Sequence, residues 1–328
     1  MRKFLLICPL CLSLLYALAL PAQAFECEPA SDGFSKSPIQ RELLPSDITS
    51  SAVSFSFEKT LYKVRPGNYR YLRFVFSKQA NEDIIWTSSD PAIAQVSQDG
   101  VVYGVTYGDV TITATGQRSG FSASCQISVC DVRQVALTFD DGPGCHTDDL
   151  LDYLENSNIK VTFFLIGNLI SRYPDTVARQ IADGHEIGYH SYNHKNQCRL
   201  SSQQITGDFE KTNLLLKELT GAEFTLWRSP GGNYDRRVLD CIRLPHICWS
   251  VDTRDWETRD PDDIYQQIVK NAKDGSIILL HDIYDTSIEG AIRGINALRA
   301  AGYEFLTVSE LLARNGEQVH NCVNYSRD

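Results

Sequence analysis

The chain has 328 residues, which is enough for two domains that each bury a core of their own. Hydrophobic residues make up 43% of the chain and charged residues 22%, as in globular proteins. The formal net charge of −10 argues against nucleic acid or an anionic membrane surface as a partner, because both recruit clustered Lys and Arg side chains.

Residues 1–24, MRKFLLICPLCLSLLYALALPAQA, are typical of a secretory signal peptide. Arg2 and Lys3 precede an apolar stretch, and a small-residue Ala-Gln-Ala sequence ends at Ala24. We predict cleavage after Ala24, which removes two basic residues and changes the formal charge from −10 to −12. The alternative is an uncleaved membrane anchor, since the 17 residues from Phe4 to Leu20 are at the short edge for spanning a bilayer. The predicted product is secreted, periplasmic or bound to the cell surface, without membrane contact.

A short N-terminal extension, residues 25–45, leads into a region that we predict to be an all-β sandwich, residues 46–130. Apolar and polar residues alternate there between turn signals such as Asp99-Gly100 and Gly108-Asp109. This region resembles bacterial immunoglobulin-like domains of the second group. The segments that carry the resemblance are Trp86 to Pro91, Ala94 to Val96, Gly100 to Val102, and Ile112 to Thr115. Such modules serve as spacers or adhesive elements, and we find no catalytic cluster in this one.

From residue 131 to 316 the pattern changes to alternating strands and helices, before a C-terminal tail at 317–328. An example of a predicted helix is SSQQITGDFEKTNLLLKELTG, which has the helical period and ends at Gly221. This alternation predicts a parallel sheet, closed or nearly closed as a distorted (β/α) barrel of about seven strands. The apolar runs are 135–139, 161–165, 185–188, 224–227, 247–251, 276–280 and 303–307.

Charged or metal-ligating side chains follow five of the predicted strands. In a parallel α/β fold the carboxyl ends of the strands carry the chemistry, so these side chains are expected to lie together. Taken singly, each also fits an ordinary role in a turn, an ion pair, the surface or a hydrogen-bonded core. They are Asp140 and Asp141, His190 and His194, Arg228, Asp252 and Asp255, and His281.

Three of these side chains form a candidate metal site. His190 and His194 are four residues apart, so they project to one side of a helical turn and can both reach one ion. One carboxylate, for which we choose Asp141, completes a set of three protein ligands that leaves coordination positions open. A divalent cation held there lowers the pKa of a bound water toward about 7 and polarises a carbonyl oxygen beside it.

Hydrolysis also needs a base and an acid, and Asp140 and His281 can fill these roles. Asp140 must stay ionised at neutral pH, which a nearby guanidinium such as that of Arg228 favours. Asp255 can hold the imidazole of His281 in one tautomer and raise its basicity.

Residues 131 to about 316 resemble the polysaccharide deacetylases of the NodB-homology group, also called carbohydrate esterase family 4. Five family motifs occur in order: Thr-Phe-Asp-Asp at 138–141, His-Ser-x-x-His at 190–194, Arg-x-Pro-x-Gly at 228–232, Asp-x-x-Asp-Trp at 252–256, and Leu-x-His at 279–281. The resemblance implies a metal held by Asp141, His190 and His194, Asp140 as the base, and His281 as the acid. It further implies that Arg228 steadies the base, that Asp255 tunes His281, and that Trp256 and Leu279 line the acetyl pocket.

Two positions depart from the family pattern. Gly231 stands where many relatives have an aromatic residue, so one wall of the substrate groove is missing, although its backbone N–H is still expected to stabilise the oxyanion. Tyr189 precedes the first histidine ligand where a small polar residue is common, and we expect it to narrow the entrance or stack on a sugar. Of the remaining histidines, His146 is near enough to contact substrate, and we expect structural or surface roles for His185, His246 and His320.

Eight cysteines remain after signal cleavage, and an even number in an exported chain suggests disulfides. Cys241 and Cys248 are the pair that we predict, because they are close in sequence and bracket a turn with a proline. Whether Cys145 and Cys198 pair with each other or elsewhere stays open. The others are Cys27, Cys125, Cys130 and Cys322.

We therefore expect a secreted, metal-dependent polysaccharide N-deacetylase that acts on N-acetylated amino sugars. Peptidoglycan N-acetylglucosamine is the first candidate substrate, followed by chitin-like chains and poly-N-acetylglucosamine. One divalent ion is expected, zinc first, with cobalt, nickel and manganese as alternatives. Two other functions remain open: an O-acetyl esterase on acetylated xylan, and a non-catalytic carbohydrate-binding surface protein. Neither the polymer nor the oligomeric state follows from the sequence.

Overall fold

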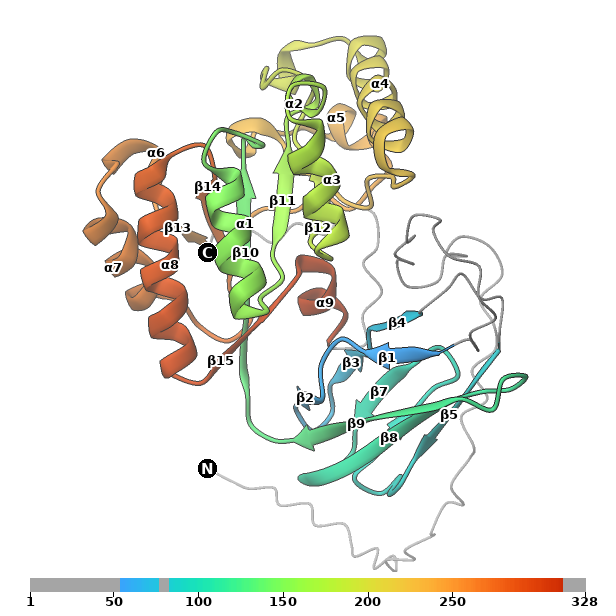
Figure 1. Cartoon of the computed structure of the whole chain (residues 1–328). Coiled ribbons are helices and arrows are strands. Elements are labelled where there is room, and N and C mark those ends of the chain that lie inside the picture. The colour runs from blue at the N-terminus through green and yellow to red at the C-terminus, as the bar shows by residue number, and fades with distance from the viewer. Residues whose placement is uncertain (1–53, 77–82, 315–328) are drawn as a thin grey trace, which may run out of the picture. The chain divides into compact units, whose positions relative to one another are not determined.

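Figure 1 shows a computed structural model of the chain, in which residues 54–76 and 83–314 are described. The predicted signal peptide, the extension at 25–45, the start of the sandwich and the tail at 317–328 lie outside the described residues, as do Cys27, His320 and Cys322. Within the described ranges, none of the helices has both the length and the apolar character that crossing a membrane requires.

Residues 54–76 and 83–129 are built of strands. One sheet has the order β2-β9-β8-β5, a second has the order β3-β7-β6, and β1 pairs with β4. The bounds are β1 Phe55–Phe57, β2 Leu61–Val64, β3 Tyr69–Tyr71, β4 Phe74–Phe76, β5 Ile84–Ser88, β6 Ala94–Val96, β7 Val101–Gly104, β8 Gly108–Gly116 and β9 Ser122–Val129.

The alternation of apolar and polar residues gives these strands one buried face. Along β8 the side chains of Val110, Ile112 and Ala114 are buried, whereas the residues between them are more exposed. They pack with Trp86 in a hydrophobic cluster confined to this region. Gly100 closes the turn before β7 with a φ of 75°, and a Cβ there would lie 2.7 Å from the Trp86 ring. The turn therefore requires glycine.

From Arg133 onward the chain forms a parallel sheet with helices around it (Figure 1). The strand order is β12-β11-β10-β14-β13, and β15 also pairs with β10. The strands β10, β11 and β14 are almost wholly buried, as is usual for parallel sheets covered on both faces. Their bounds are β10 Arg133–Asp140, β11 Thr162–Leu165, β12 Glu186–Tyr189, β13 Val251–Asp252, β14 Ile277–His281 and β15 Tyr303–Leu306.

The helices cover the sheet and connect its strands. The helix predicted to end at Gly221 is α4, which Ser201 begins with a capping box and Gly221 ends with a φ of 76°. The bounds are α1 Thr147–Ser157, α2 Gly167–Ile170, α3 Pro174–Ala182, α4 Ser202–Thr220, α5 Arg236–Cys241, α6 Asp255–Thr258, α7 Pro261–Asn271, α8 Asp285–Ala300 and α9 Val308–Ala313, with 3₁₀ turns η1 Gln197–Arg199 and η2 Pro230–Gly232.

Two of the seven predicted strands differ from expectation. The run 224–227 forms no strand, and the run 247–251 is reduced to β13. Trp227 instead makes isolated parallel bridges to Tyr189 and His246. The carbonyls of Ile247 and Cys248 accept hydrogen bonds from the Arg228 side chain. The backbone around Trp227 thus joins β12 to the segment around His246 through single bridges and not through a regular strand.

Candidate active site

Strand register brings the predicted base and acid together. Asp140 is the last residue of β10 and His281 the last residue of β14, and these two residues are direct partners in the parallel ladder. Asp140 is 3% exposed and His281 8% exposed. Both side chains are therefore held at one edge of the sheet, where the carboxyl ends of the strands meet.

The three predicted metal ligands converge at the same edge. One ligand atom from each of Asp141, His190 and His194 lies within 4.8 Å of the other two. Oδ1 of Asp141 is 3.4 Å from Nε2 of His190 and 3.1 Å from Nε2 of His194. The two imidazole rings have centroids 5.3 Å apart.

The histidines reach this arrangement from a turn, so the expectation of a helical turn is wrong. No helix spans 190–194, and Ser191 and His194 have φ angles of 67° and 58°. The N–H of His194 donates to the hydroxyl of Ser191, which closes the turn. Asp141 has a φ of 72°. Left-handed backbone costs non-glycine residues energy, and such strain clusters at functional sites.

The chemistry of this donor set fits a divalent cation. Oδ1 of Asp141 is buried and makes no hydrogen bond within the described part of the chain. Nδ1 of His190 donates to the carbonyl oxygen of Arg228 at 2.8 Å, which leaves the Nε2 lone pair for a ligand. Burial alone would raise the pKa of Asp141, but the imidazoles of His190, His194 and His281 outweigh it and lower the pKa to about 2. The carboxyl group is thus ionised, as a ligand must be.

A buried arginine pairs with Asp140. Nη1 of Arg228 lies 2.7 Å from Oδ1 of Asp140, and Arg228 is fully buried. Each guanidinium nitrogen has a further partner: Nη1 also donates to Thr138 Oγ1, Nε donates to the Ile247 carbonyl, and Nη2 donates to the Cys248 carbonyl. Because a buried ion pair is tolerated when its remaining donors are paired, this network accounts for the burial of the Asp140–Arg228 pair.

His281 has a carboxylate partner of its own. Its Nδ1 donates to Oδ1 of Asp255 at 2.8 Å, and its backbone N–H donates to Oδ2 at 2.7 Å. Burial would lower the pKa of His281, but Asp255, with Asp140 and Asp141, raises it to about 9. Nε2 of His281 lies 3.9 Å from Oδ2 of Asp141. A protonated imidazole is therefore aimed at the same point as the candidate ligands.

The residues expected to contact substrate lie in different environments. The side chain of Trp256 is 49% exposed, whereas Leu279 is 4% exposed within β14. Gly231 is exposed, with a φ of 61°. Tyr189 is fully buried, with its ring against Phe209 and Phe224, and this placement does not agree with a role at the groove entrance. The aromatic ring there fills the core because the Tyr189 side chain points away from the ligand that follows it.

Sequence reasoning missed Thr138 and Asp282. Thr138 holds the arginine, and its only signal is its place at the start of the first motif. Asp282 follows the acid His281 and accepts a hydrogen bond from Thr147 Oγ1 at 2.6 Å. Complete burial raises the pKa of Asp282 to about 7. A Cβ at Gly142 would overlap this carboxyl group, which explains why glycine follows Asp141.

The predicted Cys241–Cys248 disulfide is not present, and Cys145 and Cys198, whose pairing was left open, do not pair with each other. Cys145, Cys198 and Cys241 are free cysteines, and Cys248 is not part of a disulfide in the structure. Cys248 instead lies with Sγ 3.9 Å from Nδ1 of His246. The prediction from the short separation of Cys241 and Cys248 is thus not met, because the two cysteines have separate packing environments, one at the end of α5 and one beside a buried histidine.

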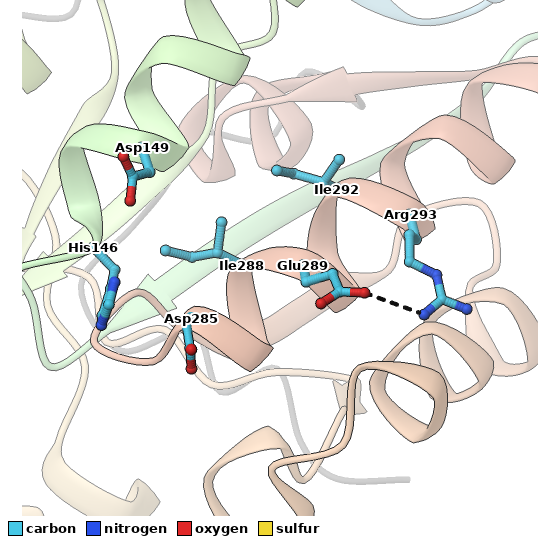
Figure 2. A pocket seen from close by; sticks show the side chains of 7 residues that line it. All are labelled: His146, Asp149, Asp285, Ile288, Glu289, Ile292 and Arg293. Carbon is cyan, nitrogen blue, oxygen red and sulfur yellow. Dashed lines mark ion pairs between the residues drawn. The ribbon is translucent and has the colours of Figure 1, made fainter.

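A hollow between α1 and α8 contains none of the candidate catalytic residues. Figure 2 shows its lining, in which Glu289 and Arg293 of α8 pair at 3.7 Å. His146 and Asp149 line it from the start of α1, and Ile288 and Ile292 line it from α8. His146 therefore faces this hollow.

Comparisons with known proteins agree with this geometry. A family model described as polysaccharide deacetylase matches residues 130–244, and one described as bacterial Ig-like domain (group 2) matches residues 72–127. The chain is 37% identical to the peptidoglycan-N-acetylglucosamine deacetylase PgdA of Listeria monocytogenes over 180 residues, which are 55% of this chain and 39% of that protein. It thus spans about two fifths of the length of that relative.

Two shorter proteins are matched over most of their length. A peptidoglycan-N-acetylglucosamine deacetylase of Bacillus cereus is 34% identical over 187 residues, 54% of this chain and 87% of the relative. The structure of a family 4 acetyl xylan esterase from Clostridium thermocellum, in complex with a cobalt ion, is 29% identical with a TM-score of 0.55. That similarity covers 58% of this chain and 95% of the esterase.

Proposed function

Because the chain belongs to the polysaccharide deacetylase family, we propose that it is a secreted, metal-dependent hydrolase that removes acetyl groups from the N-acetylated amino sugars of a polymer. Peptidoglycan N-acetylglucosamine is the preferred substrate, and chitin-like chains and poly-N-acetylglucosamine come next. The observation that carries the proposal is the convergence of Asp141, His190 and His194 beside two charge pairs, Asp140–Arg228 and His281–Asp255.

Asp141, His190 and His194 are the proposed ligands of one divalent cation, zinc first, with cobalt, nickel and manganese as alternatives. When bound, such a cation makes water more acidic and draws electron density from an acetamide carbonyl. The set offers two imidazoles and one carboxylate, which is the donor type that catalytic zinc sites use.

The remaining residues of the site move protons and hold charge. Asp140 takes a proton from the attacking water, and Arg228, which pairs with it, steadies this carboxylate. The water oxygen adds to the acetamide carbon, and the backbone N–H of Gly231 donates to the resulting oxyanion. His281 then gives its Nε2 proton to the sugar nitrogen as the carbon–nitrogen bond breaks. The products are acetate and a free amine.

Substrate contacts and domain roles complete the proposal. Trp256 and Leu279 border the space for the acetyl methyl group. The bridges at Trp227 support a distorted (β/α) barrel of about seven strands within residues 131–316. Residues 46–130 form the immunoglobulin-like domain, and residues 1–24 direct export and are then removed.

A second candidate activity is hydrolysis of O-acetyl esters on xylan. The likeness to the Clostridium thermocellum acetyl xylan esterase favours it, because the same base and acid can serve an ester. A non-catalytic carbohydrate-binding protein is disfavoured, since a protein that only binds sugar has no need of a buried base, its arginine and a protonated histidine at one point.

The test is acetate release from three polymers by the protein freed of metal with a chelator and then resupplied with zinc. We expect acetate release from peptidoglycan and from N-acetylglucosamine oligomers, and little release from acetylated xylan. Treatment with the chelator should abolish the release from the first two substrates. The Asp140→Asn variant is the matched control, because it keeps all three ligands. Faster release from xylan would favour the esterase, and release that survives chelation would contradict the proposal.

A further inference from the structure

A buried histidine outside the five motifs, His246, makes hydrogen bonds to the loop that follows Arg228. His246 is 1% exposed, and its ring lies against the rings of Trp227 and Tyr234, at centroid distances of 4.4 and 4.5 Å. Its Nε2 is 3.0 Å from the hydroxyl of Ser229 and 3.3 Å from the backbone nitrogen of the same residue. Its Nδ1 is 3.9 Å from Sγ of Cys248.

These contacts fix the tautomer of His246. The N–H of Ser229 can only donate, so Nε2 of His246 must accept and carries no proton. The ring proton is therefore on Nδ1, which points at the sulfur of Cys248. Burial, and then the positive charge of Arg228 and the His190 ring, lower the pKa of His246 to about 3, so the ring is neutral at physiological pH.

The residue that His246 holds lies between two functional groups. The carbonyl of Arg228, just before Ser229, accepts the Nδ1 proton of the ligand His190 at 2.8 Å. The carbonyl of Ser229 accepts from the N–H of Gly232 at 2.9 Å, and this bond shapes the turn that presents Gly231. A shift of Ser229 would thus move the support of one ligand and the donor for the oxyanion together.

We propose that His246 is a positioning residue for the reaction, whose imidazole fixes Ser229 and so aims the Arg228 carbonyl at His190 and the Gly231 N–H at the substrate carbonyl. The inference rests on the proposed function for the role of Gly231. It does not depend on that function for the orientation of His190. The two roles have separate readouts: turnover reports on the position of the Gly231 N–H, and metal affinity reports on the orientation of His190.

The variants to compare are His246→Leu, His246→Gln and His185→Leu. Leucine removes the acceptor, whereas the longer amide of glutamine can place an oxygen near the position of Nε2. His185 is the matched control: it is 1% exposed, burial lowers its pKa to about 3, and its Nδ1 accepts from the N–H of Val161, away from the loop at 228–232. Its removal tests the effect of losing any buried neutral histidine.

We expect His246→Leu to lower kcat by about 10- to 100-fold, with KM changed by less than about twofold. Zinc binding to the metal-free protein should weaken by about tenfold, because losing a group that orients a metal ligand has an effect of this order. His246→Gln should recover most of both, and His185→Leu should keep both near the wild-type values. Zinc affinity is measured by calorimetry, and kcat by acetate release at saturating metal.

Three results would overturn the inference: wild-type kcat and zinc affinity in His246→Leu, equal losses in His246→Gln and His246→Leu, or the same losses in His185→Leu. If the leucine variant does not fold, His246→Asn replaces it, because the shorter amide reaches the position of Nδ1 but not that of Nε2. A wild-type protein that releases no acetate would refute the proposed function, while the zinc titration would still test His246.

Discussion

The strand-rich region and the α/β region bury polar groups in different ways. Among residues 54–76 and 83–129, Arg70 is the one polar or charged residue that is buried, and it pairs with Glu304 at 3.1 Å. In the α/β region Asp140, Arg228, Asp255 and Asp282 are all buried near the carboxyl ends of β10 and β14. Burial of charge is costly, and replacing such pairs with apolar residues often stabilises a protein. The difference therefore locates function in the α/β region.

The largest effect is expected from the base. Asp140→Asn should lower turnover by about 10²- to 10⁴-fold, because the variant cannot take the proton of the attacking water, while its metal content stays near that of the wild type. His190→Ala should lose metal and activity together. Metal analysis of the purified proteins and acetate release give both values. Normal turnover in the Asp140 variant would contradict the assignment of function to the buried charges of the α/β region, since the Asp140 carboxylate would then serve stability alone.

The next effect is on the stability of the α/β region. Arg228→Met leaves the carboxylate of Asp140 buried without its partner, and breaking a buried pair in this way destabilises proteins by about 3 to 5 kcal/mol. Denaturant unfolding measures the change. The double variant with Asp140→Asn removes the orphaned charge and should recover part of the loss. If the single variant is as stable as the wild type, the pair is not desolvated as described.

The third effect is a shift in pH dependence. Asp255 raises the pKa of His281, whose folded value is about 9, so the imidazole stays protonated at neutral pH and loses its proton as the pH rises through that value. In Asp255→Asn the pKa of His281 falls, and the alkaline decline of kcat should move to lower pH. A pH–rate profile of both proteins measures it. An unmoved alkaline limb would mean that another group controls the decline.

A fourth prediction concerns acid stability. The pKa of His185 is about 3 in the folded state, below the value of about 6.5 in unfolded chains. Between these two pH values the unfolded state therefore binds more protons than the folded state. The contribution of His185 to the free energy of unfolding is fully present above about pH 6.5 and is lost as the pH falls toward 3. His185→Leu should reduce this pH dependence. Hydrogen exchange at pH 7 and pH 4.5, corrected for intrinsic rates, measures the effect. The loss of stability at pH 4.5 should appear in the α/β region, because residues 46–130 contain no histidine.

The smallest effect on activity is expected from the core of the strand-rich region. Trp86→Ala removes a side chain that is 5% exposed in the separate cluster of this region and should destabilise it by about 3 to 5 kcal/mol. The kcat/KM for a soluble N-acetylglucosamine oligomer should stay within about twofold of the wild type. A loss of activity as large as that of Asp140→Asn would show that the two regions do not divide their roles in this way.

Much of this organisation could be predicted from the sequence, because it depends on local patterns. The runs that became β10, β11, β12, β14 and β15 are apolar and bounded by turn residues, and the polar residues after them meet because parallel strands end at one edge. The helix α4 could be predicted from the helical period of its apolar residues and from Gly221, which ends it.

The remainder depends on contacts that no local pattern reveals. The run at 224–227 has strand character, but Trp227 forms isolated bridges to Tyr189 and His246 and no regular strand. The spacing of His190 and His194 suits a helix, yet the left-handed φ angles of Ser191 and His194 build a turn. Tyr189 was expected at the groove because of its neighbour in sequence, and tertiary packing places it in the core.

The central claim is that Asp141, His190 and His194 bind one divalent cation together. Anomalous diffraction from crystals grown with zinc or cobalt tests it most directly. We predict one strong peak at about 2.0 to 2.2 Å from a carboxylate oxygen of Asp141 and from Nε2 of both histidines. A strong peak elsewhere, with none between these three side chains, would contradict the account.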